Sequence, residues 1–187
     1  MNEFNPTQHP MPLMGGRPQP SFMDAVKTCL TEKYCCFSGR ARRAEFWWFQ
    51  LFYAIISFAL SFVMTFSMLS HIKDIVDDPM SMYTSPAFYV VCIVSLLFLL
   101  PNLGVSIRRL HDTNRSGWWL VMPLAFYIVI FVISLMIVDS GTPTISQSML
   151  MLFMYLALLA SGIVVLVWMC QDSDRGENRY GRSPKYQ

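Results

Sequence analysis

The chain has 187 residues, of which 54% are hydrophobic and only 14% charged, whereas soluble proteins carry about 25% charged residues. Four long stretches contain no Asp, Glu, Lys, Arg or His: 46–70, 79–107, 116–138 and 140–170. Each includes about 20 or more apolar residues, enough for a helix to cross a hydrocarbon layer roughly 30 Å thick. This composition excludes an ordinary soluble domain and predicts a membrane protein.

The N-terminal region precedes the first apolar run. Residues 1–20 contain five prolines and the Gly15-Gly16 pair, a composition that predicts a disordered tail without the apolar core of a signal peptide. Residues 21–37 have the pattern of an amphipathic helix, with Ser21 as its N-cap and Asp24 three residues later. We expect this helix to lie in the membrane interface, either as a sensor of lipids or as a hydrophobic lead into the first span.

The four apolar runs predict an all-α, polytopic membrane protein. Its transmembrane domain would cover residues 38–170, and a polar tail would follow at 171–187. Gly39 is expected to end the amphipathic helix, and the Trp47-Trp48 and Trp118-Trp119 pairs to lie at headgroup depth. The predicted transmembrane helices run approximately over 46–70, 87–107, 117–138 and 149–170.

The distribution of charge predicts how the chain is threaded. All but Lys73 of the 14 lysines and arginines lie in the N-terminal region, in the link between the second and third spans, or in the tail. The positive-inside rule puts these segments, and with them both termini, in the cytoplasm. An even number of spans is then required, in agreement with four.

Several polar residues lie within the predicted spans. Ser57, Ser61 and Thr65 form one stripe, while Ser95, Asn102 and Ser106 form another beside Pro101, which is expected to bend its helix. Such stripes either line a path for a polar solute or allow helices to approach closely. The Asn102 amide needs a hydrogen-bond partner in lipid and should therefore face another helix. No ionisable residue lies deep in a span, which argues against a proton-driven transporter.

Three charged motifs flank the spans. They read Phe37-Ser38-Gly39-Arg40-Ala41-Arg42-Arg43-Ala44-Glu45-Phe46-Trp47, then Arg108-Arg109-Leu110-His111-Asp112-Thr113-Asn114-Arg115-Ser116-Gly117-Trp118-Trp119, then Gly176-Glu177-Asn178-Arg179-Tyr180-Gly181. Together they resemble the bacterial inner-membrane family called domain of unknown function 805, the YhaH-like proteins, over about residues 22–184. The resemblance implies a multi-pass protein of the bacterial inner membrane. It implies no catalytic residues, because no activity is established for the family.

The predicted topology brings the three motifs to one side of the membrane, where their charges can meet. One interpretation is a salt-bridge lattice that ties the helices together. The other is a site for anionic headgroups, because arginine forks bind phosphate and basic clusters attract anionic lipids. The candidate residues for this cluster are Arg40, Arg42, Arg43, Glu45, Arg108, Arg109, His111, Asp112, Arg115, Glu177, Asn178 and Arg179.

The motifs indicate a binding or organising role and not an enzyme. His111 and Asp112 are adjacent and have no accompanying nucleophile motif, so a catalytic pair is not expected. The histidines and cysteines lack the spacing of metal ligands, and the arginines match no nucleic-acid module, so we expect neither a metal nor another cofactor nor nucleic acid. The predicted partners are membrane lipids, with a second copy or another membrane protein as further alternatives. A small channel or transporter for a polar solute is the alternative function.

Overall fold

The computed structural model of the protein describes residues 18–78, 81–140 and 143–186, so most of the predicted N-terminal tail lies outside the described residues. Within them, four helices are long and apolar enough to cross a membrane, which confirms the predicted number of spans. They are α2 (Arg43–Ser70), α5 (Pro86–Asp112), α6 (Val121–Ser140, preceded by the 3₁₀ turn η2, Gly117–Leu120) and α7 (Ile145–Cys170).

These helices extend beyond the predicted spans because their caps, not the charge-free runs, set their limits. Helix α5 continues five residues past 107, through both arginines to Asp112. Helix α7 begins at Ile145, where the Thr144 hydroxyl accepts from the backbone N–H of Gln147 and the Gln147 side chain bonds back to the Thr144 N–H. This reciprocal capping box adds four residues to the predicted start at 149.

The N-terminal helix is shorter than the predicted 21–37. Helix α1 (Phe22–Lys27) has the expected Ser21–Asp24 capping box and continues as the π-helical turn η1, which ends at Glu32. The chain after η1 instead crosses α5, where the Tyr34 hydroxyl donates to the Leu97 carbonyl. Gly104 permits this crossing, since a Cβ there would lie only 3.2 Å from the Cys36 carbonyl oxygen. A continued helix could not follow that path.

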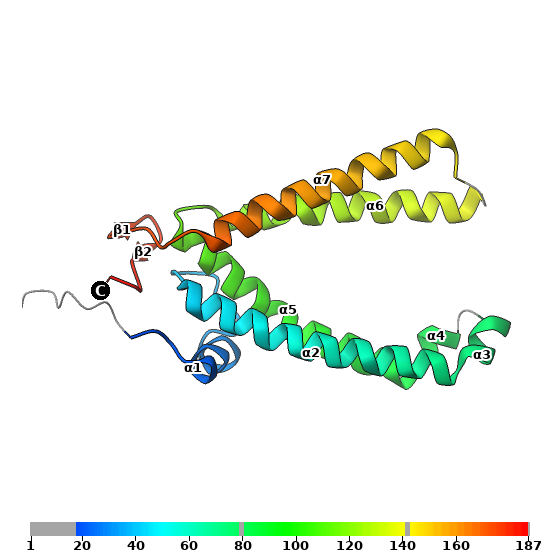
Figure 1. Ribbon diagram of the computed structural model, residues 1–187, viewed down its shortest axis with the longest axis horizontal. Helices are drawn as coiled ribbons and strands as arrows, with labels where there is room; N and C mark the ends of the chain where they lie inside the picture. Colours follow the sequence, from blue (N-terminus) through cyan, green and yellow to red (C-terminus); the bar gives the residue numbers. More distant parts are fainter. Residues whose placement is uncertain (1–17, 79–80, 141–142, 187) are drawn as a thin grey trace, which may run out of the picture.

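The membrane-spanning helices form two hairpins. Figure 1 shows α2 beside α5 and α6 beside α7, with the hairpins joined at one end and apart at the other. The short helices α3 (Ile72–Asp77) and α4 (Ser81–Thr84) lie at the open end. At the joined end the tail forms a small antiparallel pair of two-residue strands, β1 (Glu177–Asn178) and β2 (Gly181–Arg182), which was not predicted and leaves the described chain mostly helical. We call the joined end, where the N-terminal segment, the α5–η2 link and the tail meet, the basic end.

The largest buried apolar cluster lies at the basic end. Its members come from η1, the segment before α2, and helices α2, α5 and α7: Cys29, Ala41, Phe46, Phe49, Val105, Leu110 and Met169. Most large apolar residues farther along the hairpins are exposed, as expected for helices in contact with lipid. The basic end therefore provides the fixed frame that positions the charged motifs.

The amide of Asn102 faces another helix, as predicted. Its Oδ1 accepts a 2.7 Å hydrogen bond from Nε2 of Gln50 on α2, a partner that the sequence interpretation overlooked. The hydroxyls of Ser61 and Thr65 donate instead to the carbonyls of Ser57 and Ser61 within their own helix. These two hydroxyls of the first stripe therefore satisfy their hydrogen bonds without a solute.

Substitution of Asn102 by leucine is expected to destabilise the α2–α5 hairpin by about 1 kcal/mol, because the Gln50 amide would lose its partner in an apolar setting. The double variant Gln50→Leu, Asn102→Leu should recover most of this loss, since it removes both polar groups. Reversible unfolding in mixed micelles of the wild type, of the single variants Asn102→Leu and Gln50→Leu, and of the double variant measures the coupling. Purely additive effects would show that the pair contributes nothing.

Candidate functional site

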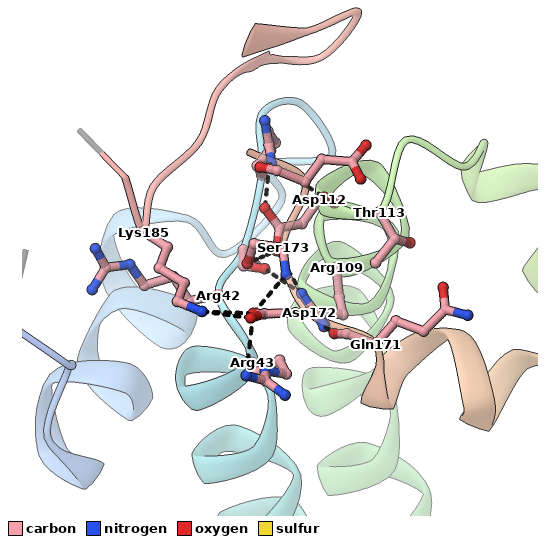
Figure 2. A network of polar contacts seen from close by, with 12 residues as sticks. Arg42, Arg43, Arg109, Asp112, Thr113, Gln171, Asp172, Ser173 and Lys185 are labelled. Atoms are coloured by element: carbon pink, nitrogen blue, oxygen red, sulfur yellow. Dashed lines mark hydrogen bonds and ion pairs between the residues drawn. The ribbon is translucent and has the colours of Figure 1, made fainter. Parts of the chain in front are cut away.

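Asp112 is the centre of the basic end. Its side chain is fully buried at the last turn of α5 and accepts hydrogen bonds from three groups. Nε of Arg40 lies 2.9 Å from Oδ1, Nη1 of Arg109 lies 2.5 Å from Oδ2, and the Ser173 hydroxyl also donates to Oδ2. We call these four residues, Arg40, Arg109, Asp112 and Ser173, the clasp (Figure 2 labels three of them).

The two arginines of the clasp also donate hydrogen bonds to backbone carbonyls, some at helix ends and some in the tail. Arg40 donates to the Asp112 carbonyl at the end of α5 and, in the tail, to the carbonyls of Asp174, Gly176 and Gly181. Arg109 donates through Nε to the Met169 carbonyl at 3.1 Å and through Nη2 to the Gln171 carbonyl. Since cations are favoured at helix C-termini, Arg109 joins α5 to the end of α7.

The clasp thus connects the two hairpins and the tail through one carboxylate. The side chains of Arg40 and Arg109 are 1% and 0% exposed, so both guanidinium groups are enclosed by protein. Two buried cations share a single buried anion, and the carbonyl oxygens supply the remaining negative partial charge. This arrangement fits the predicted salt-bridge lattice and leaves these arginines facing inward.

A second buried ion pair connects the N-terminal segment to the hairpin of α2 and α5. Nη1 of Arg108 lies 2.9 Å from Oε1 of Glu45, whose side chain is 12% exposed. Arg108 also donates to the Gly104 carbonyl and to Sγ of Cys29. Burial raises the pKa of Cys29 to about 11, so this thiol stays protonated at neutral pH. Arg108, at the end of α5, therefore connects α5 to α2 and to η1 through its hydrogen bonds.

The exposed part of the basic end contains a third set of charges (Figure 2). Asp172 pairs with Arg43 at 3.1 Å and with Lys185 at 2.7 Å, and all three side chains are 36–47% exposed. The hydrogen bond from Lys185 is the main cause that holds the pKa of Asp172 below its ordinary value, so the carboxylate is ionised at neutral pH. This set carries one positive charge in excess.

The remaining predicted residues surround the clasp without joining it. His111 stacks on Tyr180, with ring centroids 3.7 Å apart, and its Nδ1 lies 3.2 Å from the Gly39 carbonyl oxygen. His111 and Asp112 therefore have separate partners. The Asn178 amide donates to the His111 carbonyl.

Three charged residues lie farther out. Arg179 donates to the Asn114 carbonyl, and the Arg115 guanidinium lies over the Trp168 ring. Glu177 is exposed and lies 3.8 Å from Arg182 within the tail, so it supplies no counter-charge to the clasp. The arginines of the three motifs therefore do not surround one common spot: some are buried in the clasp and in the Arg108–Glu45 pair, and others lie on an exposed rim.

The tail contributes residues that the sequence interpretation missed. Ser173 belongs to the clasp, Asp172 and Lys185 form the exposed set with Arg43, and the Pro184 carbonyl accepts from Nε of Arg42. The Asp172-Ser173-Asp174 sequence directly after the last span was the available signal. Carboxylates at a helix C-terminus are disfavoured by the helix dipole, so their placement there indicates that cations lie close by.

Comparison with known proteins gives one family. The model of the family described as "Protein of unknown function (DUF805)" matches residues 34–182. The inner membrane protein YhaI of Escherichia coli is 30% identical over 155 residues, which cover 83% of this chain and 91% of YhaI. The inner membrane protein YhaH of the same organism is 27% identical, over 82% of this chain and 91% of YhaH. No solved structure matches the chain.

Proposed function

The chain belongs to the DUF805 family of proteins of unknown function, and we propose that it binds anionic phospholipids at the cytoplasmic face of the inner membrane. The relatives YhaI and YhaH are named inner membrane proteins, which supports this location. The excess of arginine and lysine at the basic end supports a cytoplasmic orientation for that end. The role is non-enzymatic: the protein organises lipid around itself.

The observation that carries this proposal is the exposed cationic rim around the clasp. Arg40 and Arg109 are buried in the clasp, and Arg108 is buried in its pair with Glu45. Other cations of the basic end remain on the surface: Arg43, Arg175, Arg179 and Arg182. Exposed Trp47, Trp48, Trp118 and Trp119 surround the same end of the helices, at the level where tryptophan meets headgroups. Each basic residue near an anionic membrane surface contributes roughly 1 kcal/mol of attraction.

The alternative of a channel or transporter receives less support from the geometry. The Ser61 and Thr65 hydroxyls bond within their own helix, and Asn102 pairs with Gln50 between α2 and α5. Polar groups with such partners need no solute to satisfy their hydrogen bonds. The Asn102–Gln50 hydrogen bond also stabilises the packing of α2 against α5. Three of the polar groups that suggested a transport path, those of Ser61, Thr65 and Asn102, thus have partners within the protein.

The test uses the tail, whose exposed arginines can be changed without touching the clasp. The variant Arg175→Gln, Arg179→Gln, Arg182→Gln is expected to bind phosphatidylglycerol on the order of 100-fold more weakly than the wild type, because three surface charges at roughly 1 kcal/mol each are lost. Native mass spectrometry of protein extracted from mixed phosphatidylglycerol–phosphatidylcholine vesicles measures the retained lipid. Lys73→Gln, at the open end, is the matched control and should behave as wild type. Equal retention by all three proteins would contradict the proposal.

A further inference from the structure

One groove at the basic end combines a cation, two tryptophans and an apolar surface. It has a volume of about 580 Å³ and lies between the start of α2 and the end of α7, with Gln19 of the N-terminal segment at its edge. Arg43, Trp47 and Leu51 line it from one helix. We propose that this groove holds a single anionic phospholipid, a proposal that rests on the proposed function and names its site.

The groove presents the three chemical zones of a phospholipid in the correct order. Arg43, Trp47 and Leu51 follow one another at intervals of four residues, so they lie along one face of α2 about 6 Å apart. All three are exposed: the Arg43 side chain is 45% exposed, and the residues Trp47 and Leu51 are 40% and 48% exposed. A guanidinium group thus meets the phosphate, an indole ring meets the glycerol region, and an aliphatic chain meets the acyl chain.

The neighbouring residues give the groove its width and its polarity. Trp48 forms the second wall and is fixed by edge-to-face packing against Phe22, with ring centroids 5.9 Å apart. Ala44, Gln19 and Cys170 complete the lining of the groove. The apolar lining, with Trp47, Trp48 and Leu51, therefore distinguishes this groove from the rest of the cationic rim, which attracts anionic headgroups but offers no surface for an acyl chain.

The charges beside the groove select an anionic headgroup. Arg43 and Lys185 both pair with Asp172, so the set has a single excess positive charge. A phosphate that approaches Arg43 gains that attraction but is opposed by the Asp172 carboxylate. Removal of the carboxylate and removal of the guanidinium should consequently change lipid occupancy in opposite directions.

Two native cysteines provide matched local probes. Cys170 lines the groove, whereas Cys92 is exposed on the lipid side of α5, away from it. One variant keeps Cys170 by Cys35→Ser, Cys36→Ser and Cys92→Ser, and its counterpart keeps Cys92 by Cys35→Ser, Cys36→Ser and Cys170→Ser. Cys29 remains in both, because burial and its raised pKa keep that thiol unreactive.

The experiment attaches a small alkyl diazirine to the thiol and irradiates the protein in nanodiscs of equal phosphatidylglycerol and phosphatidylcholine. The mass of each adduct identifies the crosslinked lipid. We expect the ratio of phosphatidylglycerol to phosphatidylcholine to be at least about fivefold higher at Cys170 than at Cys92, since one charge contact contributes roughly 1 kcal/mol. Arg43→Gln should lower the Cys170 ratio to that of Cys92, Asp172→Asn should raise it, and Lys73→Gln, at the open end, should leave it unchanged.

The outcomes separate this site from the general function. Equal ratios at Cys170 and Cys92, or a Cys170 ratio that Arg43→Gln does not change, would overturn the groove. If the tail arginines still control total phosphatidylglycerol retention in that case, the proposed function stands without this site. Loss of the Cys170 preference on addition of inorganic phosphate would also overturn the inference, because the groove would then recognise the anion and not the lipid.

Discussion

Substitution of Asp112 by alanine is expected to lower the free energy of unfolding by about 3–5 kcal/mol, the usual cost of removing one partner from a buried ion pair. The side chains of Arg40 and Arg109 would remain enclosed, with no carboxylate to compensate their charges. The Ser173 hydroxyl would lose its acceptor as well. Since these groups hold α5, α7 and the tail together, the two hairpins should separate at the basic end.

Unfolding of purified protein by sodium dodecyl sulfate in mixed micelles, followed by tryptophan fluorescence, measures this loss. Glu177→Gln is the matched control, because Glu177 is an exposed carboxylate paired at 3.8 Å with an exposed arginine. Surface pairs contribute about 0–1 kcal/mol, so the control should unfold almost as the wild type does. An Asp112→Ala protein as stable as the control would show that the clasp does not hold the hairpins together.

The transmembrane helices could be predicted from the sequence because a helix that crosses the hydrocarbon layer needs about 20 consecutive apolar residues. The sequence also predicted that Asn102 would face another helix, since an amide in lipid needs a partner. The limits of the elements depended on local contacts that no such rule describes. Gly104 shortens the N-terminal helix by admitting the crossing chain, and the Thr144 box lengthens α7.

The candidate cluster could be predicted as a set but not as a network. Arg108 and Arg109 are neighbours in the sequence, yet successive residues on a helix point about 100° apart. Arg108 consequently reaches Glu45 on α2, while Arg109 reaches the end of α7. Both side chains are buried, and which partner each one meets depends on how the helices pack. The backbone carbonyls of Met169 and Gln171 that accept from Arg109 carry no side-chain signal in the sequence.

The Arg108–Glu45 pair provides the second test of how the basic end is built. Arg108→Met alone is expected to cost about 3–5 kcal/mol, because Glu45 would remain largely buried without its partner. Glu45→Leu alone should cost a similar amount by leaving Arg108 buried and unpaired. The double variant Arg108→Met, Glu45→Leu should unfold within about 1 kcal/mol of the wild type, since apolar side chains of similar size can replace a buried pair.

The same double variant separates the bracing role of this pair from lipid binding. Its substitutions lie inside the protein and leave the exposed rim and the Arg43 groove intact. We therefore expect it to retain as much phosphatidylglycerol as the wild type in native mass spectrometry. A double variant that is stable but loses the lipid would show that Arg108 reaches a headgroup, which would move the binding site from the rim into the bundle. Stable protein with unchanged retention would assign Arg108 and Glu45 to the frame alone.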